Sequence, residues 1–175
     1  LQFSLSAIDQ PIAQDAGGIN EQQASTDRRS ARDRNVLFDA GEKLDQQRFT
    51  ALYKADRLGG EVTVRNYYAN RDFANKLPFT GGGAVDLQRF YYGLGAQYAS
   101  DQSSSSRFHF VTGFDLDRQD DDRKRFDNNE GTIEDLVFDQ NEKVESNGVF
   151  VQTRLVLSDS WNLSAGLRFD DVEFD

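Results

Sequence analysis

The sequence predicts an all-β protein, an antiparallel up-and-down meander that forms a segment of a large transmembrane β-barrel with long extracellular loops and short periplasmic turns. Apolar and polar residues alternate over several runs, as they do along a strand whose two faces have different surroundings. Short connections between these runs alternate with long, polar ones. Aromatic residues gather beside the short connections. These three observations together indicate a membrane barrel.

The alternation is clearest near the C-terminal end, in GVFVQTRLVLSDSWNLSAGLRFDD, residues 148–171. One parity is apolar from Val149 to Leu157 and, after a short turn, from Trp161 to Phe169. Successive strand residues point to opposite faces, so we expect the apolar face to contact lipid. The other parity carries the polar residues that we expect to face a watery lumen: Gln152, Arg154, Arg168 and Asp170.

Similar runs predict seven strands, with two local irregularities. The expected strands are residues 1–8, 45–54, 61–69, 84–99, 107–117, 147–158 and 161–172. In the fourth, Val85 and Leu87 have the opposite parity to the aromatic residues that follow, so a β-bulge is expected there. In the first long connection, Asn20 is expected to cap a short helix over EQQASTDRRSAR.

The connections differ in length according to the end of the meander at which they lie. The short ones are residues 55–61, 100–106 and 158–160, and the long, polar ones are 9–44, 70–83 and 118–146. Outer-membrane barrels have this asymmetry, with short periplasmic turns and long extracellular loops. The alternative is a self-contained soluble β-sandwich that acts as an extracellular binding or adhesion module, which would show the same alternation but has no reason to gather its long loops at one end.

Four aromatic residues lie beside the short connections, where a barrel has one of its aromatic girdles. The residues expected at this membrane interface are Tyr53, Tyr98, Phe108 and Trp161. Each of them taken singly is equally consistent with an ordinary core residue at a strand end. Their occurrence at the same end of four strands favours the girdle.

The composition excludes several classes of protein. Hydrophobic residues make up 37% of the chain and the mean hydropathy is -0.70, so no stretch approaches the roughly 18 apolar residues of a membrane helix. The net charge of -10 argues against a nucleic-acid surface. There is no cysteine, hence no disulfide framework and no thiolate metal site.

Candidate catalytic and metal-binding groups are sparse. His109 is the only histidine and has no second histidine or cysteine to work with, so it is interpreted as a lumen-facing or loop-packed residue. The acidic stretch 115–135 has enough carboxylates for Ca²⁺, but its spacing does not fit an EF-hand loop, and interleaved arginines and lysines favour a solvated loop. We expect no enzyme activity, no bound metal and no cofactor.

Ligand contacts are expected from the long connections. Residues 70–83 combine Arg71, Phe73 and Phe79 with glycines, and an arginine fork suits the oxygens of an anionic chelate. Arg32 and Arg34 in the first long connection are the second choice. The alternative is that the aromatic residues only anchor the loop to the rim of the barrel.

Three stretches give the chain a family resemblance: NYYANRDFANKLPF (66–79), GGGAVDLQRFYYGLGAQY (81–98) and the hairpin at 148–171. They resemble the barrel of TonB-dependent outer-membrane receptors, with ferric-siderophore receptors the most similar in character, and the resemblance covers nearly the whole chain. It implies a plug domain inside a barrel of about 22 strands. It also implies uptake of an iron chelate or other scarce nutrient, driven by the TonB complex through the plug.

The resemblance also sets expectations for the extent and location of this chain. Residues 1–175 are expected to be a partial β-barrel domain, without the plug, the TonB-contacting segment and the remaining strands. The opening LQFSLSAID begins in mid-pattern, which suggests that the true N-terminus lies upstream. The expected location is the outer membrane of a Gram-negative bacterium, in contact with its lipid.

Overall fold

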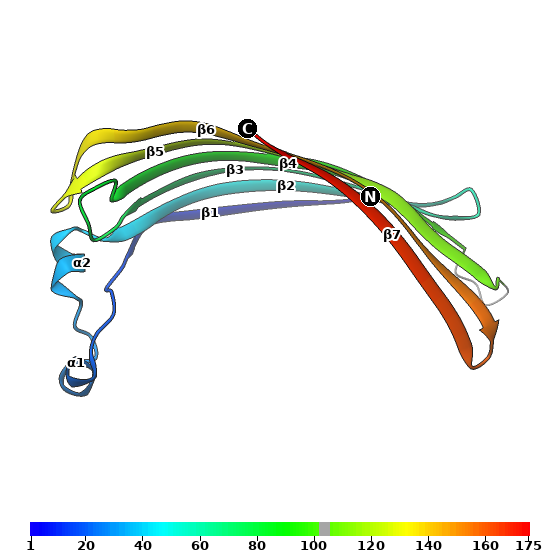
Figure 1. Cartoon of the computed structure of the whole chain (residues 1–175), viewed down its shortest axis with the longest axis horizontal. Coiled ribbons are helices and arrows are strands. Elements are labelled where there is room, and N and C mark those ends of the chain that lie inside the picture. Colours follow the sequence, from blue (N-terminus) through cyan, green and yellow to red (C-terminus); the bar gives the residue numbers. More distant parts are fainter. Residues whose placement is uncertain (102–105) are drawn as a thin grey trace.

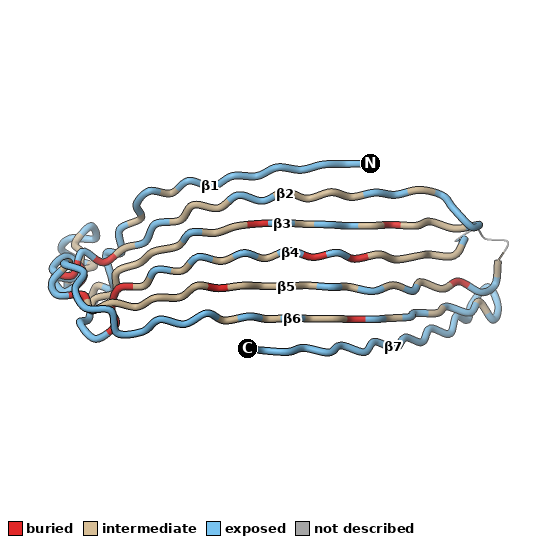
Figure 2. The backbone as a smooth tube through the Cα atoms, turned by 90° about the horizontal axis from the view of Figure 1, so that it is seen from above, coloured by how far each residue is buried: buried red, intermediate tan, exposed pale blue. Residues whose placement is uncertain are grey.

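The computed structural model describes residues 1–101 and 106–175 and contains one antiparallel sheet with the strand order β1-β2-β3-β4-β5-β6-β7 (Figure 1). The strands are β1 (Gln2–Gln14), β2 (Gly41–Arg57), β3 (Gly60–Lys76), β4 (Ala84–Ser100), β5 (Phe108–Asn129), β6 (Thr132–Ser158) and β7 (Trp161–Phe174). Each strand pairs with its neighbours in sequence, which confirms the predicted meander. Figure 2 shows the seven strands side by side in a single layer, and this excludes the sandwich alternative for the described residues.

The strands are much longer than expected, and the prediction that residues 118–146 and 70–76 form loops is wrong, although 77–83 do connect two strands. β5 and β6 continue through 118–146 and are joined only by Glu130 and Gly131. Ion pairs between the two strands support this extension, with Arg118 Nε 3.3 Å from Glu145 Oε2 and Arg123 Nη2 3.1 Å from Glu142 Oε2. Charged residues of opposite sign on facing positions favour pairing without an apolar face.

Two of the turns have the geometry of tight hairpins. At the β5–β6 turn, φ is 48° at Glu130 and 89° at Gly131, and at the β2–β3 turn it is 57° at Leu58 and 75° at Gly59. Two successive residues with positive φ define a type I′ turn, whose twist matches that of paired strands. Residues 102–105 of the expected short connection at 100–106 lie outside the described residues.

The bulge expected in β4 is absent, because its register with β3 and with β5 is unbroken from Ala84 onward. Val85 and Leu87 lie on the face of the sheet opposite to that of Phe90 and Tyr92. Leu87 is the register partner of Phe73 there. The register shifts lie instead in β1 beside β2, near the tip of the β5–β6 hairpin, and at the end of β6 beside β7. The apolar residues of β4 therefore change from one face to the other because the surroundings of the strand change along its length, and not because of a bulge.

The connection between β1 and β2 contains two short helices, α1 (Glu21–Thr26) and α2 (Asp33–Leu37). The predicted cap is confirmed: Asn20 Oδ1 accepts from the N–H of Gln23, and Gln23 Oε1 accepts from the N–H of Asn20. The predicted helix is too long, since α1 ends before Asp27. Figure 1 shows both helices beyond the strand ends, on the concave side of the curved sheet. No helix among the described residues is long and apolar enough to cross a membrane.

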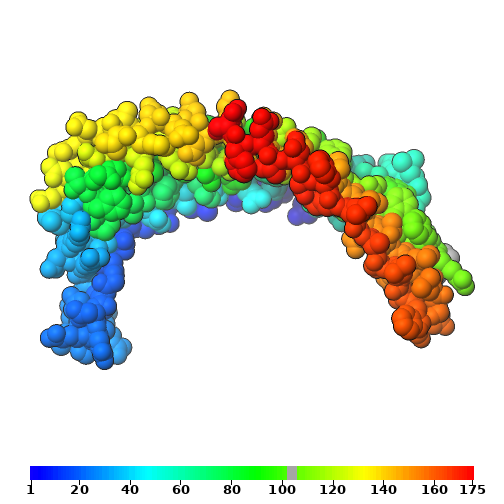
Figure 3. Space-filling view, in the orientation of Figure 1, coloured from blue at the N-terminus to red at the C-terminus, as the bar shows by residue number. Residues whose placement is uncertain are grey.

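Burial is inverted relative to a soluble domain. The buried hydrophobic residues are Phe38, Ala40, Ala69 and Ala84. Large apolar side chains on the strands are exposed instead, with Leu5 at 81% and Leu167 at 79% of their surface. Figures 1 and 3 show a thin, arched layer with no second layer packed on it. The apolar face of the sheet therefore has no partner within the described chain.

Candidate membrane and ligand surfaces

The register places the apolar parities of the strands on one face of the sheet, which we call the apolar face. One row of register partners across six strands shows this: Tyr53, Val64, Ala96, Phe114, Val149 and Phe169. On β4 the residues of this face from Asp86 to Leu94 are exposed, whereas those of the opposite face are half-buried or buried. The expected single apolar face is thus a property of the structure.

The apolar face has the height of a bilayer core. On β4 to β7 its residues span 90–98, 108–116, 149–157 and 161–169, which are nine residues each. A strand that crosses a membrane needs about 9–11 residues. Most of the length of β5 and β6 lies beyond these segments, where charged and polar residues predominate apart from a short apolar stretch near the hairpin tip, with Ile133, Leu136, Val137 and Phe138.

The apolar band runs obliquely across the sheet. Its boundary at the short-turn end is marked by the four aromatic residues expected there: Tyr53, Tyr98, Phe108 and Trp161. From β2 to β7 this boundary moves about eight residues along the strands, or roughly 26 Å, over about 24 Å of strand spacing. The opposite boundary, from Phe49 to Phe169, moves about four residues, or roughly 13 Å. These slopes correspond to a strand tilt of about 30–50°, a range that includes the tilt of about 35–45° found in membrane barrels.

The opposite face, called here the polar face, carries a ladder of charge contacts made possible by glycines. In one row of register partners, Arg65, Gly95, Asp115, Gly148 and Asp170 follow each other across five strands. Arg65 Nη2 lies 2.5 Å from Asp115 Oδ1, over Gly95. A Cβ at Gly95 would lie 2.7 Å from both Arg65 Nε and Asp115 Oδ1. The glycine therefore leaves the room that the two side chains need to meet across β4.

The same arrangement occurs twice more on the polar face. Arg168 reaches Asp115 over Gly148, with Nη1 3.0 Å from Oδ2. In the next row the hydroxyl of Tyr67 donates to Asp117 Oδ1 at 2.5 Å over Gly93. Sequence reasoning missed Arg65, Tyr67, Asp115 and Asp117, although their parity, opposite to that of the aromatic band, was a signal that could have found them.

The residues predicted to face a lumen all lie on the polar face: Gln152, Arg154, Arg168 and Asp170. Arg168 Nη2 is 2.7 Å from Asp170 Oδ1. Arg154 Nη2 donates to Asn162 Oδ1 at 3.4 Å. His109 is buried on the same face, and its Nδ1 lies 2.9 Å from the carbonyl oxygen of Asp101.

The acidic stretch is divided between the two faces of the long hairpin, since it is not a loop. Asp121 is 3% exposed and accepts two bonds from Arg89, from Nε at 2.8 Å and Nη2 at 2.5 Å. Lys124, far beyond the apolar band, donates to Asp122 at 3.0 Å, and this bond raises the pKa of the lysine. Within residues 1–101 and 106–175 no group of three possible metal ligands comes together.

The ligand candidates fall into separate places. Arg71 and Phe73 lie within β3 on the polar face, so their expected loop position is wrong. Arg71 donates from Nε and Nη2 to Gln46 Oε1, at 2.8 and 2.5 Å. Phe79 lies in the connection between β3 and β4 and is 37% exposed.

The second-choice ligand candidates lie in the segment that contains the helices. Arg32 precedes α2 as its N-cap residue. Arg34 lies within α2, with its guanidinium carbon 5.5 Å from the centre of the Phe38 ring. The structure thus brings Arg71 and Phe73 to one face of the sheet, and it shows no contact that joins them to Phe79, Arg32 or Arg34.

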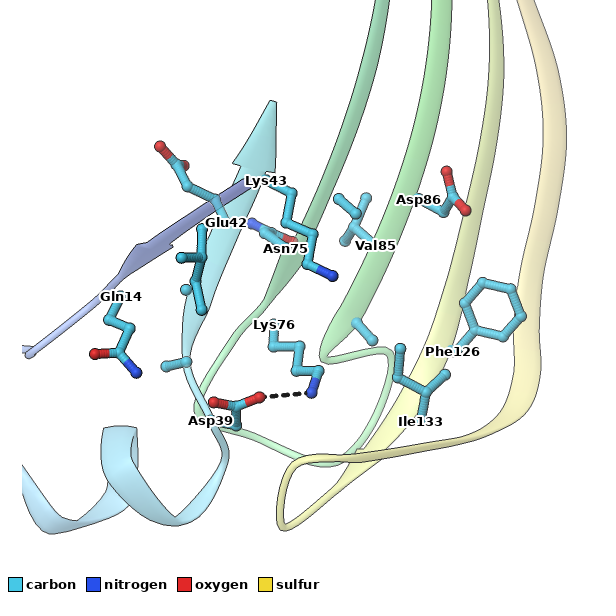
Figure 4. A pocket seen from close by; sticks show the side chains of 15 residues that line it. Gln14, Asp39, Glu42, Lys43, Asn75, Lys76, Val85, Asp86, Phe126 and Ile133 are labelled. Carbon is cyan, nitrogen blue, oxygen red and sulfur yellow. Dashed lines mark hydrogen bonds and ion pairs between the residues drawn. The ribbon is translucent and has the colours of Figure 1, made fainter. Parts of the chain in front are cut away.

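A cavity of about 250 Å³ lies near the loop end, between β1, β2 and the ends of β3 to β5 (Figure 4). Its lining includes Gly41, Ala74 and Ala84, whose register positions belong to the apolar face. Lys76 crosses its lower part to Asp39, with Nζ 2.7 Å from Oδ2. The lining also includes Glu42, Asn75 and Val85 of the polar face, but neither Arg71 nor Phe73 lines the cavity.

A one-layer meander with an unpartnered apolar face nine residues high and a charged opposite face is a sector of the wall of a transmembrane β-barrel. The chain belongs to the TonB dependent receptor-like, beta-barrel family, whose model matches residues 4–175. Proteins of this family are transporters of the Gram-negative outer membrane and not enzymes. Membership implies a substrate and TonB as partners.

Proposed function

We propose that the chain forms part of the barrel wall of a receptor that binds a ferric siderophore, or a similarly scarce nutrient, at the cell surface and passes it across the outer membrane. The observation that carries this proposal is the inverted polarity of the sheet. In the proposed orientation the apolar face contacts lipid, with Tyr53, Tyr98, Phe108 and Trp161 at the periplasmic interface. The polar face, with Gln152, Arg154, Arg168 and Asp170, then lines the lumen.

The edges of the sheet support a closed barrel in the membrane. β1 and β7 each have one neighbour among the described strands. Unpaired backbone groups cost several kcal/mol each in hydrocarbon, so spanning sheets close on themselves. We therefore propose that residues 1–175 are a partial barrel domain whose two edges pair with further strands of the complete receptor.

The end of the sheet that carries the long β5–β6 hairpin and the two helices is proposed to face outside. Long extensions lie on the extracellular side of outer-membrane barrels and short turns on the periplasmic side. A nutrient from outside then first meets residues 15–40 and the upper part of the polar face. Arg71 and Phe73 are proposed ligand contacts there, because a guanidinium and an aromatic ring share one face. Phe79, Arg32 and Arg34 are proposed as additional contacts.

The test is equilibrium binding of a radiolabelled ferric hydroxamate and a ferric catecholate chelate to cells that carry the complete receptor. Arg71→Ala should weaken binding of the recognised chelate about ten- to a hundredfold, since a charge-assisted hydrogen bond contributes about 1.5–3 kcal/mol. Arg154→Ala is the matched control, because Arg154 lies on the same face near the short turns. Its binding should equal that of the unmodified receptor.

The outcomes separate the parts of the proposal. If Arg71→Ala binds normally while deletion of 15–40 abolishes binding, the ligand surface is the helical segment and not β3. If neither change affects binding of any chelate that the receptor takes up, the loop end is not the ligand surface. If no iron chelate is bound at all, the siderophore assignment is wrong and other scarce nutrients become the substrates to examine.

A further inference from the structure

The loop end contains a polar side chain with no exposed surface, Asn128, near the tip of the β5–β6 hairpin. It is the largest fully buried side chain among the described residues. Buried polar groups are costly unless they are hydrogen-bonded, so a buried asparagine indicates a specific set of partners.

The amide of Asn128 bonds to three separate segments of the chain. Its Nδ2 donates to the carbonyl oxygen of Phe38 at 3.1 Å and to that of Leu77 at 3.0 Å. Its Oδ1 accepts from the N–H of Gly131 at 2.9 Å. Its backbone N–H donates to the carbonyl oxygen of Thr80 at 3.0 Å. The segment that contains the helices, the β3–β4 connection and the hairpin turn therefore meet at one residue.

A β-bulge directs this side chain inward. The register between β5 and β6 shifts between Phe126 and Asn128, next to the turn. Bulges commonly re-aim a side chain away from the ordinary alternation of a strand. Next to this irregularity the side chain of Asn128 bonds to main-chain groups of neighbouring segments.

Three further contacts join the same segments. Lys76 Nζ donates to Asp39 Oδ2 at 2.7 Å and to the carbonyl oxygen of Gly131 at 2.8 Å. Asp127 Oδ1 accepts from the N–H of Gly82 at 3.0 Å. These contacts are at least partly accessible to water, so each contributes less than a fully buried bond. Asn128 is the buried centre of the group.

We propose that Asn128 is a positioning residue that fixes residues 15–40 and 77–83 against the tip of the β5–β6 hairpin, so that the loop end is one preorganised platform. Arg32 and Arg34 are then presented from a fixed segment instead of a free loop. The proposal rests on the proposed function only for the statement that this platform faces outside the cell.

The chemistry of the side chain suggests three substitutions with different expected effects. Asn128→Asp retains the acceptor for Gly131 but removes both donors that hold Phe38 and Leu77. Asn128→Ala removes all three side-chain bonds. Asn129→Ala is the matched control, because the neighbouring asparagine is exposed and, among the described residues, its side chain bonds only to that of Glu134, at 2.9 Å.

The experiment is trypsin treatment of intact cells that carry the complete receptor, with cleavage followed after Arg28 and Arg29, which are exposed between α1 and α2. Asn128→Ala and Asn128→Asp should raise the cleavage rate about tenfold or more, because cleavage follows the population of the opened segment. Asn129→Ala should leave the rate unchanged. Equal rates in all variants would overturn the proposal.

Hydrogen exchange of the purified receptor, resolved by segment, distinguishes positioning from general loosening. Asn128→Asp should reduce protection at 35–40 and 77–80 and preserve it at the hairpin turn, where the acceptor remains. Uniform loss of protection over all three segments would overturn the specific role of the two donors. Cleavage of the variants only after the cells are permeabilised would contradict the outward orientation and leave the role of Asn128 intact.

Discussion

At the scale of single residues, glycines, which have no side chain, allow charged and polar side chains to meet across the polar face. Tyr67 and Asp117 belong to β3 and β5, which are not neighbours, yet the hydroxyl reaches the carboxylate at 2.5 Å. The strand between them carries Gly93 at the crossing point, and a Cβ there would lie 2.5 Å from Asp117 Oδ1 and from the Tyr67 ring. A single absent methyl group thus permits contact between second-neighbour strands.

Gly93→Ala should therefore destabilise the barrel by about 1–3 kcal/mol, through overpacking and loss of the Tyr67–Asp117 bond. The measurement is the free energy of unfolding of the complete barrel in urea, in lipid vesicles. Gly166→Ala is the control, because Gly166 lies on the same face and an added Cβ would meet nothing closer than 3.5 Å. Equal free energies for the two variants would show that the crossing does not depend on glycine.

At the scale of elements, each long strand is divided into an apolar part that fits the bilayer and a polar part that extends beyond it. On β6 the apolar part is 149–157, whereas residues 139–148 before it, apart from Val144, carry charged and polar side chains or glycine on both faces. The hairpin remains paired there because cross-strand charges replace the apolar contacts. Strand length and membrane thickness are therefore independent in this chain.

This division predicts a gradient of tolerance to charge along β6. Val151→Arg, close to the middle of the apolar band, should cost about 2–4 kcal/mol of folding free energy in lipid, and Leu157→Arg at its edge about 0–1 kcal/mol. Gln152→Arg should cost little, since Gln152 lies on the polar face beside Val151. Folding equilibria in lipid vesicles measure all three. Equal costs for Val151→Arg and Gln152→Arg would refute the assignment of the lipid face.

At the scale of the whole molecule, the oblique apolar band determines how the sheet sits in the membrane. Tyr53, Ala96 and Phe169 belong to one row of register partners, yet Tyr53 lies at the short-turn boundary of the band and Phe169 at the opposite one. A row that crosses the band from edge to edge requires strands tilted to the membrane normal. Sheet closure into a barrel requires the same tilt.

Spin labels at these three positions should therefore lie at different depths. The chain has no native cysteine, so single cysteine variants of it can be labelled without interference from its own residues. Over about 24 Å of strand spacing, a tilt of about 40° separates Tyr53 and Phe169 by roughly 15 Å in depth, with Ala96 between them. Collision rates with oxygen and with a water-soluble nickel complex report the depth. Equal depths would contradict the tilt, and labels accessible only to the nickel complex would contradict the lipid face.

The sequence by itself determined the meander and the single apolar face, because alternation with period two is a local property of a strand in a layered environment. It also determined the N-cap at Asn20, because a cap depends only on residues that are close in sequence. These features need no knowledge of distant residues. The family resemblance added the membrane and the class of transporter.

Only the tertiary structure decided where the strands end and which polar residues meet. Residues 118–146 appeared to be a loop because no apolar face runs through them, but their pairing depends on charges contributed by the facing strand. Likewise Asp115 joins arginines from β3 and β7, and Asn128 joins segments around Phe38 and Leu77. Such contacts depend on register across several strands. A single run of sequence does not determine register where both faces are polar, because no buried face then selects one pairing.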